Sequence, residues 1–329
     1  MAILLLSFLL ILASVQLAVA FTPVVKTVIV DLHGGGEFRS IQKAINTIPD
    51  GNQNWTKIHI KAGIYSEKVN LTYNKGRIVF EGEGAMQTII QWGDYCNADT
   101  PEEQMVEMET PQTPTFTSAA TDVVFKWITF QNNYADVKNP KIAVAMLVSG
   151  DKTSFYGCSF VGIQDTLADM QGRHYFKDCS IVGGVDFIFG YGQSLYETCS
   201  IDVVSGLPVP GWVTAQGRYE AGQPNGFVFK NCRLSGSSLV FLGRAWRSYS
   251  RVVFYNTSMA GIVVPPGWDS WLTPDNGNNT QYGEAGCNGA GANTAGRVPW
   301  ERKLNSKYLR RITSISFIDN EGWLNDQGH

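Results

Sequence analysis

Two aspartates occupy equivalent positions in two similar stretches of the chain. Asp165 lies seven residues after Cys158, and Asp186 lies seven residues after Cys179. The stretches are 21 residues apart, and each begins with a Cys-Ser pair followed by an apolar residue. Equal offsets in consecutive repeats predict that the two carboxyl groups lie one above the other, about 4.8 Å apart as neighbouring strands are.

Two carboxyl groups at that separation cannot behave alike. At about 5 Å and an effective dielectric of about 20, two carboxylates repel by about 3 kcal/mol, which separates their pKa values by roughly two units. One then keeps a proton while the other is an anion, as general-acid and nucleophilic chemistry require. The alternative is that both cap exposed turns, but the apolar run Phe187, Ile188 and Phe189 directly after Asp186 favours the functional interpretation.

Arg244 and Gln164 are candidates to complete this chemistry. Arg244 lies in the apolar stretch "FLGRAW", where packing could fix its guanidinium so that it holds one aspartate ionised through bidentate hydrogen bonds. An exposed salt bridge is the alternative. Gln164 directly precedes Asp165, and its amide could donate to an oxyanion. Adjacent strand side chains point to opposite faces, so both can face one cleft only if the backbone bends between them.

Other hydrolytic machinery is missing from the sequence. There is no G-x-S-x-G motif, and the four histidines form no H-E-x-x-H motif or zinc-spaced cluster. We therefore expect neither a metal nor another cofactor. The aspartate pair alone suits an aspartyl esterase or a retaining glycosidase, whose carboxyl groups lie about 5–5.5 Å apart. The spacing does not separate these two chemistries.

Six similar segments must position these residues. They are rich in Val, Phe, Tyr and Ile, which favours strands, and they recur every 20 to 33 residues, which is typical of a repeat protein. The segments are residues 123–130, 153–160, 174–181, 194–201, 227–234 and 252–259. One strand per turn of about 20 residues, stacked in parallel, predicts an all-β parallel β-helix. A β-sandwich is the alternative, but it would usually have hairpins at spacings of about 8–12 residues.

Both ends of such a solenoid need covering. Residues 40–48 have apolar side chains at i, i+3, i+4 and i+7, with Ser40 placed as the N-cap and Pro49 as the stop. We expect this stretch to be an N-terminal capping helix. We expect the tail after Trp300 to pack along the outside of the solenoid.

The N-terminal residues predict export. Residues 3–12 are apolar except for Ser7, and "AVA" at 18–20 fits a signal peptide cut after Ala20, which leaves residues 21–329 as one domain. The stretch has no Lys or Arg before its apolar run, so a membrane anchor is the alternative. The net charge of −3 gives no reason to expect nucleic acid or an anionic membrane as a partner.

Two further features fit an extracellular protein. The number of cysteines is even, at six, as is common where disulfides form. Four N-x-[ST] sequons are candidate glycosylation sites, at Asn54, Asn70, Asn256 and Asn278.

Six motifs in fixed order make the chain resemble the pectin methylesterases. They are "GIYSE" (63–67), "AVAMLVSGD" (143–151), "GIQDTL" (162–167), "GGVDFIFG" (183–190), "VTAQGR" (213–218) and "LGRAW" (242–246). The resemblance covers nearly all of the mature chain and is to a short plant-type member without the inhibitor-like pro-region. It implies a right-handed parallel β-helix, a metal-free and cofactor-free monomer secreted to the cell wall, methyl-esterified homogalacturonan (pectin) as substrate, and a proteinaceous pectinesterase inhibitor as a partner.

The resemblance also implies a role for each site residue. Asp186 would attack the methyl-ester carbonyl, and Asp165 would protonate the departing methanol and then activate water. Arg244 would hold Asp186 ionised, and Gln164 would donate to the tetrahedral oxyanion. The substrate-contacting residues would be Trp246, Trp268 and Phe187.

Two cysteine pairings fit the repeat. Cys179, Cys199 and Cys232 occupy the same column in consecutive repeats, and the coil spacing lies within the range that a disulfide accepts. The resemblance favours the pair Cys199–Cys232 over Cys179–Cys199. Closing this loop could add roughly 3–4 kcal/mol.

Four positions depart from the family pattern. Ile142 stands where a glutamine is usual, Ala168 replaces a tyrosine, Gly184 a threonine and Ala245 a proline. The last three would adjust the shape of the cleft. Ile142 removes an amide from the chemistry, so the alternative function is that of a wall protein that binds pectin with weak or no turnover.

Overall fold

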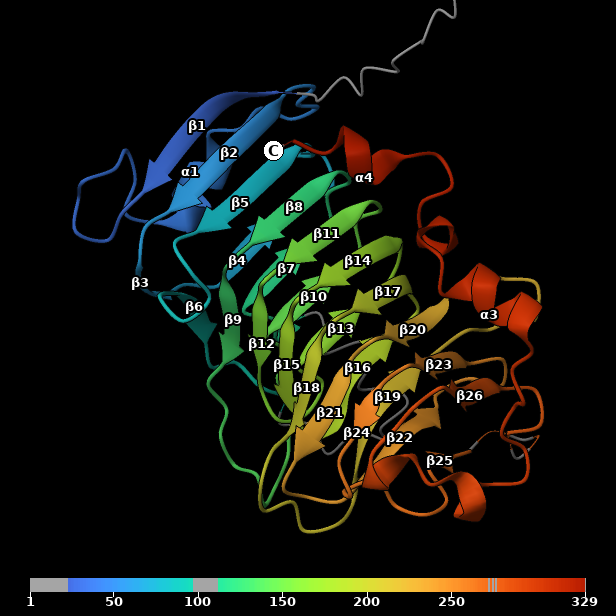
Figure 1. Cartoon of the computed structure of the whole chain (residues 1–329). Coiled ribbons are helices and arrows are strands. Elements are labelled where there is room, and N and C mark those ends of the chain that lie inside the picture. Colours follow the sequence, from blue (N-terminus) through green and yellow to red (C-terminus); the bar gives the residue numbers. More distant parts are fainter. Residues whose placement is uncertain (1–22, 97–111, 272, 274, 276, 329) are drawn as a thin grey trace, which may run out of the picture.

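A computed structural model describes residues 23–96, 112–271, 273, 275 and 277–328 (Figure 1). The expected signal peptide, residues 1–20, lies outside the described residues. Among the helices of the described ranges, none is long and apolar enough to cross a membrane.

The chain winds into three parallel sheets, and each sheet takes every third strand along most of its length (Figure 1). The first sheet has the order β1 (Val24–Val30), β2 (Trp55–Ile60), β5 (Ile78–Gly82), β8 (Val123–Lys126), β11 (Thr153–Tyr156), β14 (Arg173–Lys177), β17 (Gln193–Glu197), β20 (Gly226–Lys230), β23 (Arg251–Tyr255) and β26 (Gln281–Ala285). The second sheet has the order β4 (Val69–Leu71), β7 (Phe116–Ser118), β10 (Met146–Val148), β13 (Leu167–Asp169), β16 (Val185–Gly190), β19 (Gly211–Gln216), β22 (Val240–Ala245) and β25 (Trp268–Asp269). The third sheet has the order β3 (Gly63–Ser66), β6 (Thr88–Trp92), β9 (Thr129–Asn132), β12 (Ser159–Val161), β15 (Ser180–Gly183), β18 (Ser200–Val203), β21 (Arg233–Gly236) and β24 (Ser258–Met259).

The predicted parallel β-helix is confirmed, but the expected single strand per turn is wrong. Each recurring segment contains two strands, as β11 and β12 show, and a third strand completes the coil. Two residues separate these strands, and the first of the two has positive φ, for example Gly157 (φ 58°) and Asp178 (φ 53°). One left-handed residue redirects the chain without a run of turn residues. The alternation of polar and apolar residues therefore continues across the bend, so the sequence does not show that each segment contains two strands.

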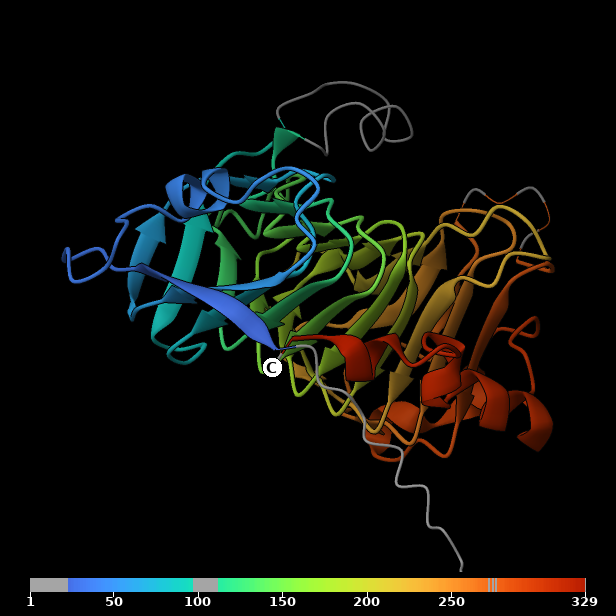
Figure 2. The same cartoon turned by 90° about the horizontal axis from the view of Figure 1, so that it is seen from above.

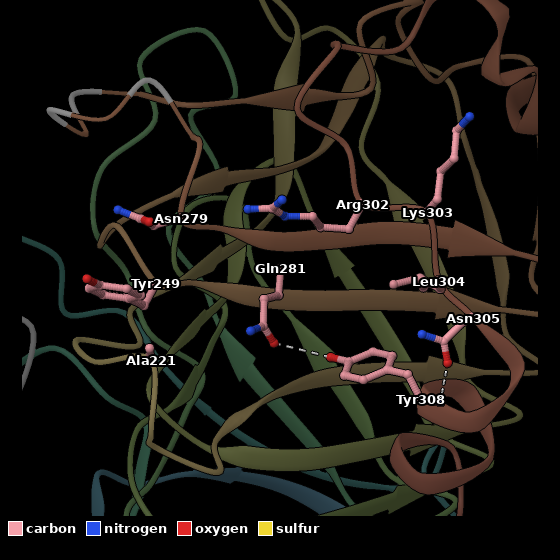
Figure 3. Close-up of a pocket in the computed structure, with 9 residues that line it drawn as sticks. All are labelled: Ala221, Tyr249, Asn279, Gln281, Arg302, Lys303, Leu304, Asn305 and Tyr308. Carbon is pink, nitrogen blue, oxygen red and sulfur yellow. Dashed lines mark hydrogen bonds between the residues drawn. The ribbon is translucent and has the colours of Figure 1, made fainter.

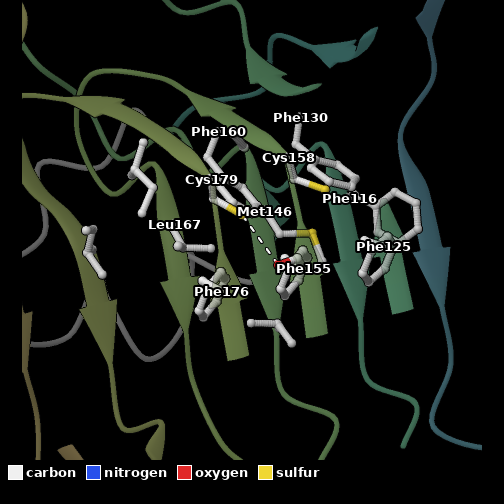
Figure 4. Packing of buried hydrophobic residues seen from close by; sticks show 14 of the residues in the cluster. Phe116, Phe125, Phe130, Met146, Phe155, Cys158, Phe160, Leu167, Phe176 and Cys179 are labelled. Atoms are coloured by element: carbon white, nitrogen blue, oxygen red, sulfur yellow. Dashed lines mark hydrogen bonds between the residues drawn. The ribbon is translucent and has the colours of Figure 1, made fainter. Parts of the chain in front are cut away.

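Aromatic side chains stack along the interior from coil to coil (Figure 4). Phe155 is in register with Phe125 and Phe176, and its ring stacks on theirs at centroid distances of 4.9 and 4.7 Å. Tyr196 extends the row at 4.4 Å from Phe176. All four side chains have no exposed surface. Such pairs add about 0.5–1.5 kcal/mol each beyond the burial of their area, so this row stabilises the contact between successive coils.

The expected Cys199–Cys232 disulfide is absent from the structure, which corrects that prediction. All six cysteines are free thiols: Cys96, Cys158, Cys179, Cys199, Cys232 and Cys287. The Cys199 sulfur lies 3.5 Å from the carbonyl oxygen of Phe176, and the Cys232 sulfur lies 3.4 Å from that of Tyr196. Each thiol thus contacts the backbone of the preceding coil. Burial raises the pKa of both thiols well above its usual value, so they behave as small apolar core residues.

The predicted N-terminal capping helix is confirmed as α1 (Ile41–Asn46). The Ser40 side chain accepts a hydrogen bond from the backbone N–H of Lys43 at 3.2 Å, as an N-cap does. Ile41, Ala44 and Ile45 are buried against the first coil, so the helix covers the open end of the interior.

The C-terminal tail packs on the outside of the first sheet, as predicted (Figures 1 and 2). After Trp300 it contains α3 (Ser306–Ile312), η4 (Ile315–Phe317) and α4 (Trp323–Asp326), whereas η2 (Ala290–Ala292) and η3 (Thr294–Gly296) come before it. Ile312, Ile318 and Trp323 are buried in a cluster with side chains of the sheet such as Leu195. Near the chain end, the Gln327 side-chain amide donates to the carbonyl oxygen of Lys152 at 2.8 Å.

The four candidate glycosylation sites are accessible. The asparagines of the sequons all have exposed side chains: Asn54, Asn70, Asn256 and Asn278. Their glycosylation stays a prediction.

The start of the tail carries a pH-sensitive group. Burial, with the nearby Glu284 as the next cause, raises the pKa of Glu301 to about 7 from 4.5. A carboxyl group with a raised folded pKa stabilises the fold while protonated, and this contribution is lost as pH rises from about 4.5 through about 7. We expect Glu301→Gln to match the wild-type melting temperature near pH 4.5 and to exceed it at about pH 8.

Thermal unfolding followed by circular dichroism at both pH values measures this difference. Glu220→Gln, at an exposed loop residue, is the control and should leave the pH dependence unchanged. An equal melting-temperature gap between Glu301→Gln and wild type at both pH values would contradict the prediction.

Candidate active site

The two aspartates are neighbours on consecutive coils, as their equal offsets predict. Gln164 bridges to Val185 in parallel, and the backbone N–H of Asp165 donates to the Val185 carbonyl at 3.0 Å. Two residues further on, Leu167 is in register with Ile188. Asp165 and Asp186 therefore follow one another across the start of strands β13 and β16.

The backbone bends at both aspartates. Asp165 has φ 60° and Asp186 has φ 47°, a conformation that side-chain-bearing residues seldom adopt. The bend breaks the alternation of a strand directly after Gln164. This is the bend that Gln164 and Asp165 need in order to face one cleft. The same conformation occurs at other bends of the solenoid, such as Asp178, so it positions the aspartates but does not by itself indicate a functional site.

The guanidinium of Arg244 binds the carboxylate of Asp186. Its Nε lies 2.8 and 2.9 Å from the two carboxylate oxygens, and its Nη2 makes a further short contact to Oδ2. Asp186 is 5% exposed and Arg244 is 6% exposed. Both groups are almost completely buried, so these charge-assisted hydrogen bonds favour the ionised form of the Asp186 carboxyl group and fix its orientation. The pair spans two coils, since β19 lies between β16 and β22.

Two indole rings and an acid hold the guanidinium of Arg244 in place. Its Cζ lies 4.4 Å from the ring centroid of Trp212 and 3.7 Å from that of Trp271. Asp269 accepts from Trp212 Nε1 at 3.0 Å and from the Trp271 backbone N–H at 2.7 Å. Sequence reasoning missed these three residues. Asp269 is in parallel register with Arg244, so the position of strand β25 would have indicated Asp269 and its neighbour Trp271. The sequence alone did not predict that strand.

Two of the three expected substrate-contacting residues lie in the interior, which corrects those predictions. Phe187 has no exposed surface, because the left-handed Asp186 before it turns its side chain inward. Trp268 is 1% exposed and packs on Tyr282 at a centroid distance of 4.7 Å. In strand β25 it is Trp268 that faces the interior, so the next residue, Asp269, faces outward.

Trp246 belongs to an aromatic row at the C-terminal ends of strands β16, β19 and β22 of the second sheet. It is 7% exposed and stacks on Tyr191 at 4.6 Å, and Tyr191 stacks on Tyr219 at 5.3 Å. The Arg247 guanidinium lies 5.1 Å from the Tyr219 ring and 5.3 Å from the Trp246 ring. Tyr219 is 49% exposed, so the row emerges at the surface. Sequence reasoning also missed Tyr191 and Tyr219, because they lie in different loops.

Ile142 lies on the coil before Gln164, directly in register with it. Its side chain is 3% exposed and packs in an apolar cluster with Val144, Ala168 and Phe189. A glutamine at this position would place a second amide beside Gln164, whereas isoleucine presents an apolar wall.

Comparisons with known proteins identify relatives of the whole chain. The family described as pectinesterase matches residues 27–321. "Probable pectinesterase 29" of Arabidopsis thaliana is 44% identical over 309 residues, which cover 91% of this chain and 89% of that protein. "Probable pectinesterase 55" of the same plant is 43% identical, with 91% and 90% covered.

Solved structures share the fold. A pectin methylesterase from carrot is 31% identical with a TM-score of 0.83, over 90% of this chain and 94% of that one. A pectin methylesterase in complex with a hexasaccharide is 26% identical with a TM-score of 0.76, over 89% and 97%. By fold and by sequence, the chain belongs to the pectinesterase family.

Proposed function

We propose that this protein hydrolyses the methyl esters of homogalacturonan by means of an aspartyl nucleophile and an aspartyl acid and base. The observation that carries the proposal is the buried Asp186–Arg244 pair, with Asp165 one coil away. A carboxylate held ionised and oriented beside a second carboxyl group can attack an ester without a metal. The hexasaccharide bound by a structural relative supports a polysaccharide as the substrate.

In the first half of the reaction, a carboxylate oxygen of Asp186 attacks the ester carbonyl carbon. The tetrahedral intermediate carries an oxyanion, to which the Gln164 amide donates. As the intermediate collapses, the bond to the methoxy group breaks and Asp165 gives that oxygen its proton. Methanol leaves, and an anhydride links Asp186 to the galacturonate.

In the second half, the ionised Asp165 takes a proton from water, and the resulting hydroxide attacks the galacturonate carbonyl of the anhydride. The bond to Asp186 breaks and its carboxylate returns to Arg244. Asp165 is again protonated, and the product is a free galacturonate carboxyl group. No step of this scheme requires a metal or another cofactor.

The proposed activity also implies a location, an oligomeric state and partners for the protein. We expect secretion to the cell wall after removal of residues 1–20, and a monomer formed by residues 21–329. We expect pectin as the substrate and a proteinaceous pectinesterase inhibitor as a protein partner.

A second candidate function is pectin binding with little turnover. The observation that favours it is the apolar Ile142 beside Gln164, which leaves one amide where the family pattern has two. Methanol release from methylated pectin separates the two candidates, because a binding protein would release little or none.

The first functional prediction concerns the aspartates. We expect Asp186→Asn and Asp165→Asn each to lower methanol release by at least about 10³-fold, because each removes a proton-transfer or bond-forming group. Asp178→Asn is a matched control, since Asp178 is an exposed aspartate with positive φ at another bend of the solenoid.

Folding is checked separately by circular dichroism. Asp186→Asn weakens the partner of a buried guanidinium and could unfold the protein, so Asp165→Asn serves as the second variant. Near-normal methanol release by folded Asp186→Asn would exclude it as the nucleophile.

The second functional prediction concerns Ile142. Loss of one oxyanion donor has cost other hydrolases about 10²–10³ in turnover. We expect Ile142→Gln to raise kcat on methylated pectin at least several-fold, by placing an amide beside Gln164. Ile142→Leu, which keeps an apolar side chain of similar volume, should not raise it.

The measurement is kcat per folded molecule, because an amide in this apolar cluster could cost about 1–3 kcal/mol of stability. Unchanged or lower turnover for folded Ile142→Gln would show that another group already compensates at this position.

A further inference from the structure

A cationic pocket lies outside the aspartate site, where the C-terminal tail crosses the loops that follow the second sheet (Figure 3). Its volume is about 400 Å³, and its walls include Ala221 of the loop after β19 and Tyr249 of the loop after β22. Arg302, Lys303 and Tyr308 of the tail form another wall. We call this space the tail pocket.

Positive charge gathers here without acids. Arg302 and Lys303 line the tail pocket, and Arg251 and Arg311 line an adjoining pocket that also contains Ala221. Neither pocket has an Asp or Glu among its described lining residues. Within the described ranges, these four cations form no ion pair. Cations that are not neutralised by the protein can be neutralised by a bound anion.

A fifth cation is buried behind the wall. Arg218 has no exposed surface, and its guanidinium donates to the carbonyl oxygens of Tyr249 and Ala221, the latter at 2.9 Å. Its Nη2 is buried and has no hydrogen-bond partner among the described residues. Burial, with the nearby Arg251 as the next cause, lowers the pKa of Arg218 to about 10. The carbonyl contacts explain the position of this side chain, but they leave its charge uncompensated.

Neutral polar groups complete the pocket. The Gln281 side-chain oxygen accepts from Arg251 Nε at 2.8 Å and from the Tyr308 hydroxyl at 3.3 Å (Figure 3). The oxygen of Gln281 is thus occupied by two donors. Its Nε2 has no hydrogen-bond partner in the described part of the chain and remains available to an acceptor.

We propose that the tail pocket binds a small oxyanion. Arg302 and Lys303 give its lining two positive charges, and Gln281 gives it a neutral donor, with the uncompensated charge of Arg218 behind its wall. The Nε and Nη2 of Arg302 donate to the carbonyl oxygens of Thr280 and Asn278, so Arg302 offers a bound anion its charge and its remaining Nη1 donor. Two sources share this chemistry, a galacturonate carboxylate and free inorganic phosphate. The galacturonate source rests on the proposed function, which produces such carboxylates, whereas the oxyanion site does not depend on it.

The location gives such a ligand a route to the substrate. Ala221 lies two residues after Tyr219, and Tyr249 lies three residues after Trp246, so both loops also carry the aromatic row at the C-terminal ends of β16, β19 and β22. A de-esterified stretch of the polymer that passes along this row would present carboxylates toward the tail pocket. A methyl ester has no negative charge for these cations, so binding here would favour product over substrate.

The test is isothermal titration calorimetry on the full chain at fixed ionic strength. The probes are sodium phosphate, galacturonate and its methyl ester. We expect galacturonate to bind and the methyl ester not to bind. The double substitution Arg302→Gln/Lys303→Gln should weaken anion binding by about tenfold or more. The control is Lys307→Gln/Arg310→Gln, which removes the same charge from exposed residues of α3 that do not line the pocket, and it should leave binding nearly unchanged.

The outcomes are distinct. Phosphate binding without galacturonate binding would support the oxyanion site and reject its uronate source. Lack of binding by either anion at about 10 mM, or equal loss in the two double variants, would overturn the proposal. Lys303→Gln alone is the second variant, because Arg302 also donates to the Thr280 carbonyl and its loss could disturb folding. Methanol release is measured in parallel, so failure of the esterase proposal and failure of this one are seen separately.

Discussion

In-register stacking of parallel coils is the constraint on which the rest of this structure depends. Each coil places a given position one strand spacing from the same position of the next coil. In the interior this brings Phe125, Phe155 and Phe176 face to face, where like side chains attract. At the start of the neighbouring strands β13 and β16 it brings Asp165 and Asp186 together, where like charges repel. One rule of construction therefore produces both the stable core and the reactive pair.

A cation from another coil offsets this repulsion. Arg244 comes from a coil two strands away from Asp186, and its partners Trp212, Asp269 and Trp271 come from that coil's neighbours. Removing the arginine would leave a carboxylate in nearly dry surroundings, which is costly. The site is therefore a row of side chains that runs across several coils. Its members are far apart in the sequence, so sequence order does not show that they lie together.

The sequence was sufficient for whatever the repeat determines. The recurring columns predicted the parallel β-helix and the neighbouring aspartates, and the helical periodicity of residues 40–48 predicted the N-terminal cap. It failed where one backbone angle decides the direction of a side chain. The positive φ of Asp186 turns Phe187 inward, and the alternation in β25 sends Trp268 inward. The thiols of Cys199 and Cys232 share a column, but that column does not tell whether they turn toward each other or toward carbonyl oxygens.

The packing of the C-terminal tail along the first sheet changes how this solenoid can unfold. A solenoid whose coils touch only their neighbours can unravel from either end, one coil at a time. Here the tail leaves the last coil, runs back along the first sheet, and ends with Gln327 bonded to Lys152, 175 residues earlier in the chain. The last coil cannot detach without also losing contacts in the middle. The coils that carry the aspartates therefore belong to the same cooperative unit as the C-terminus, and partial unwinding from that end is suppressed.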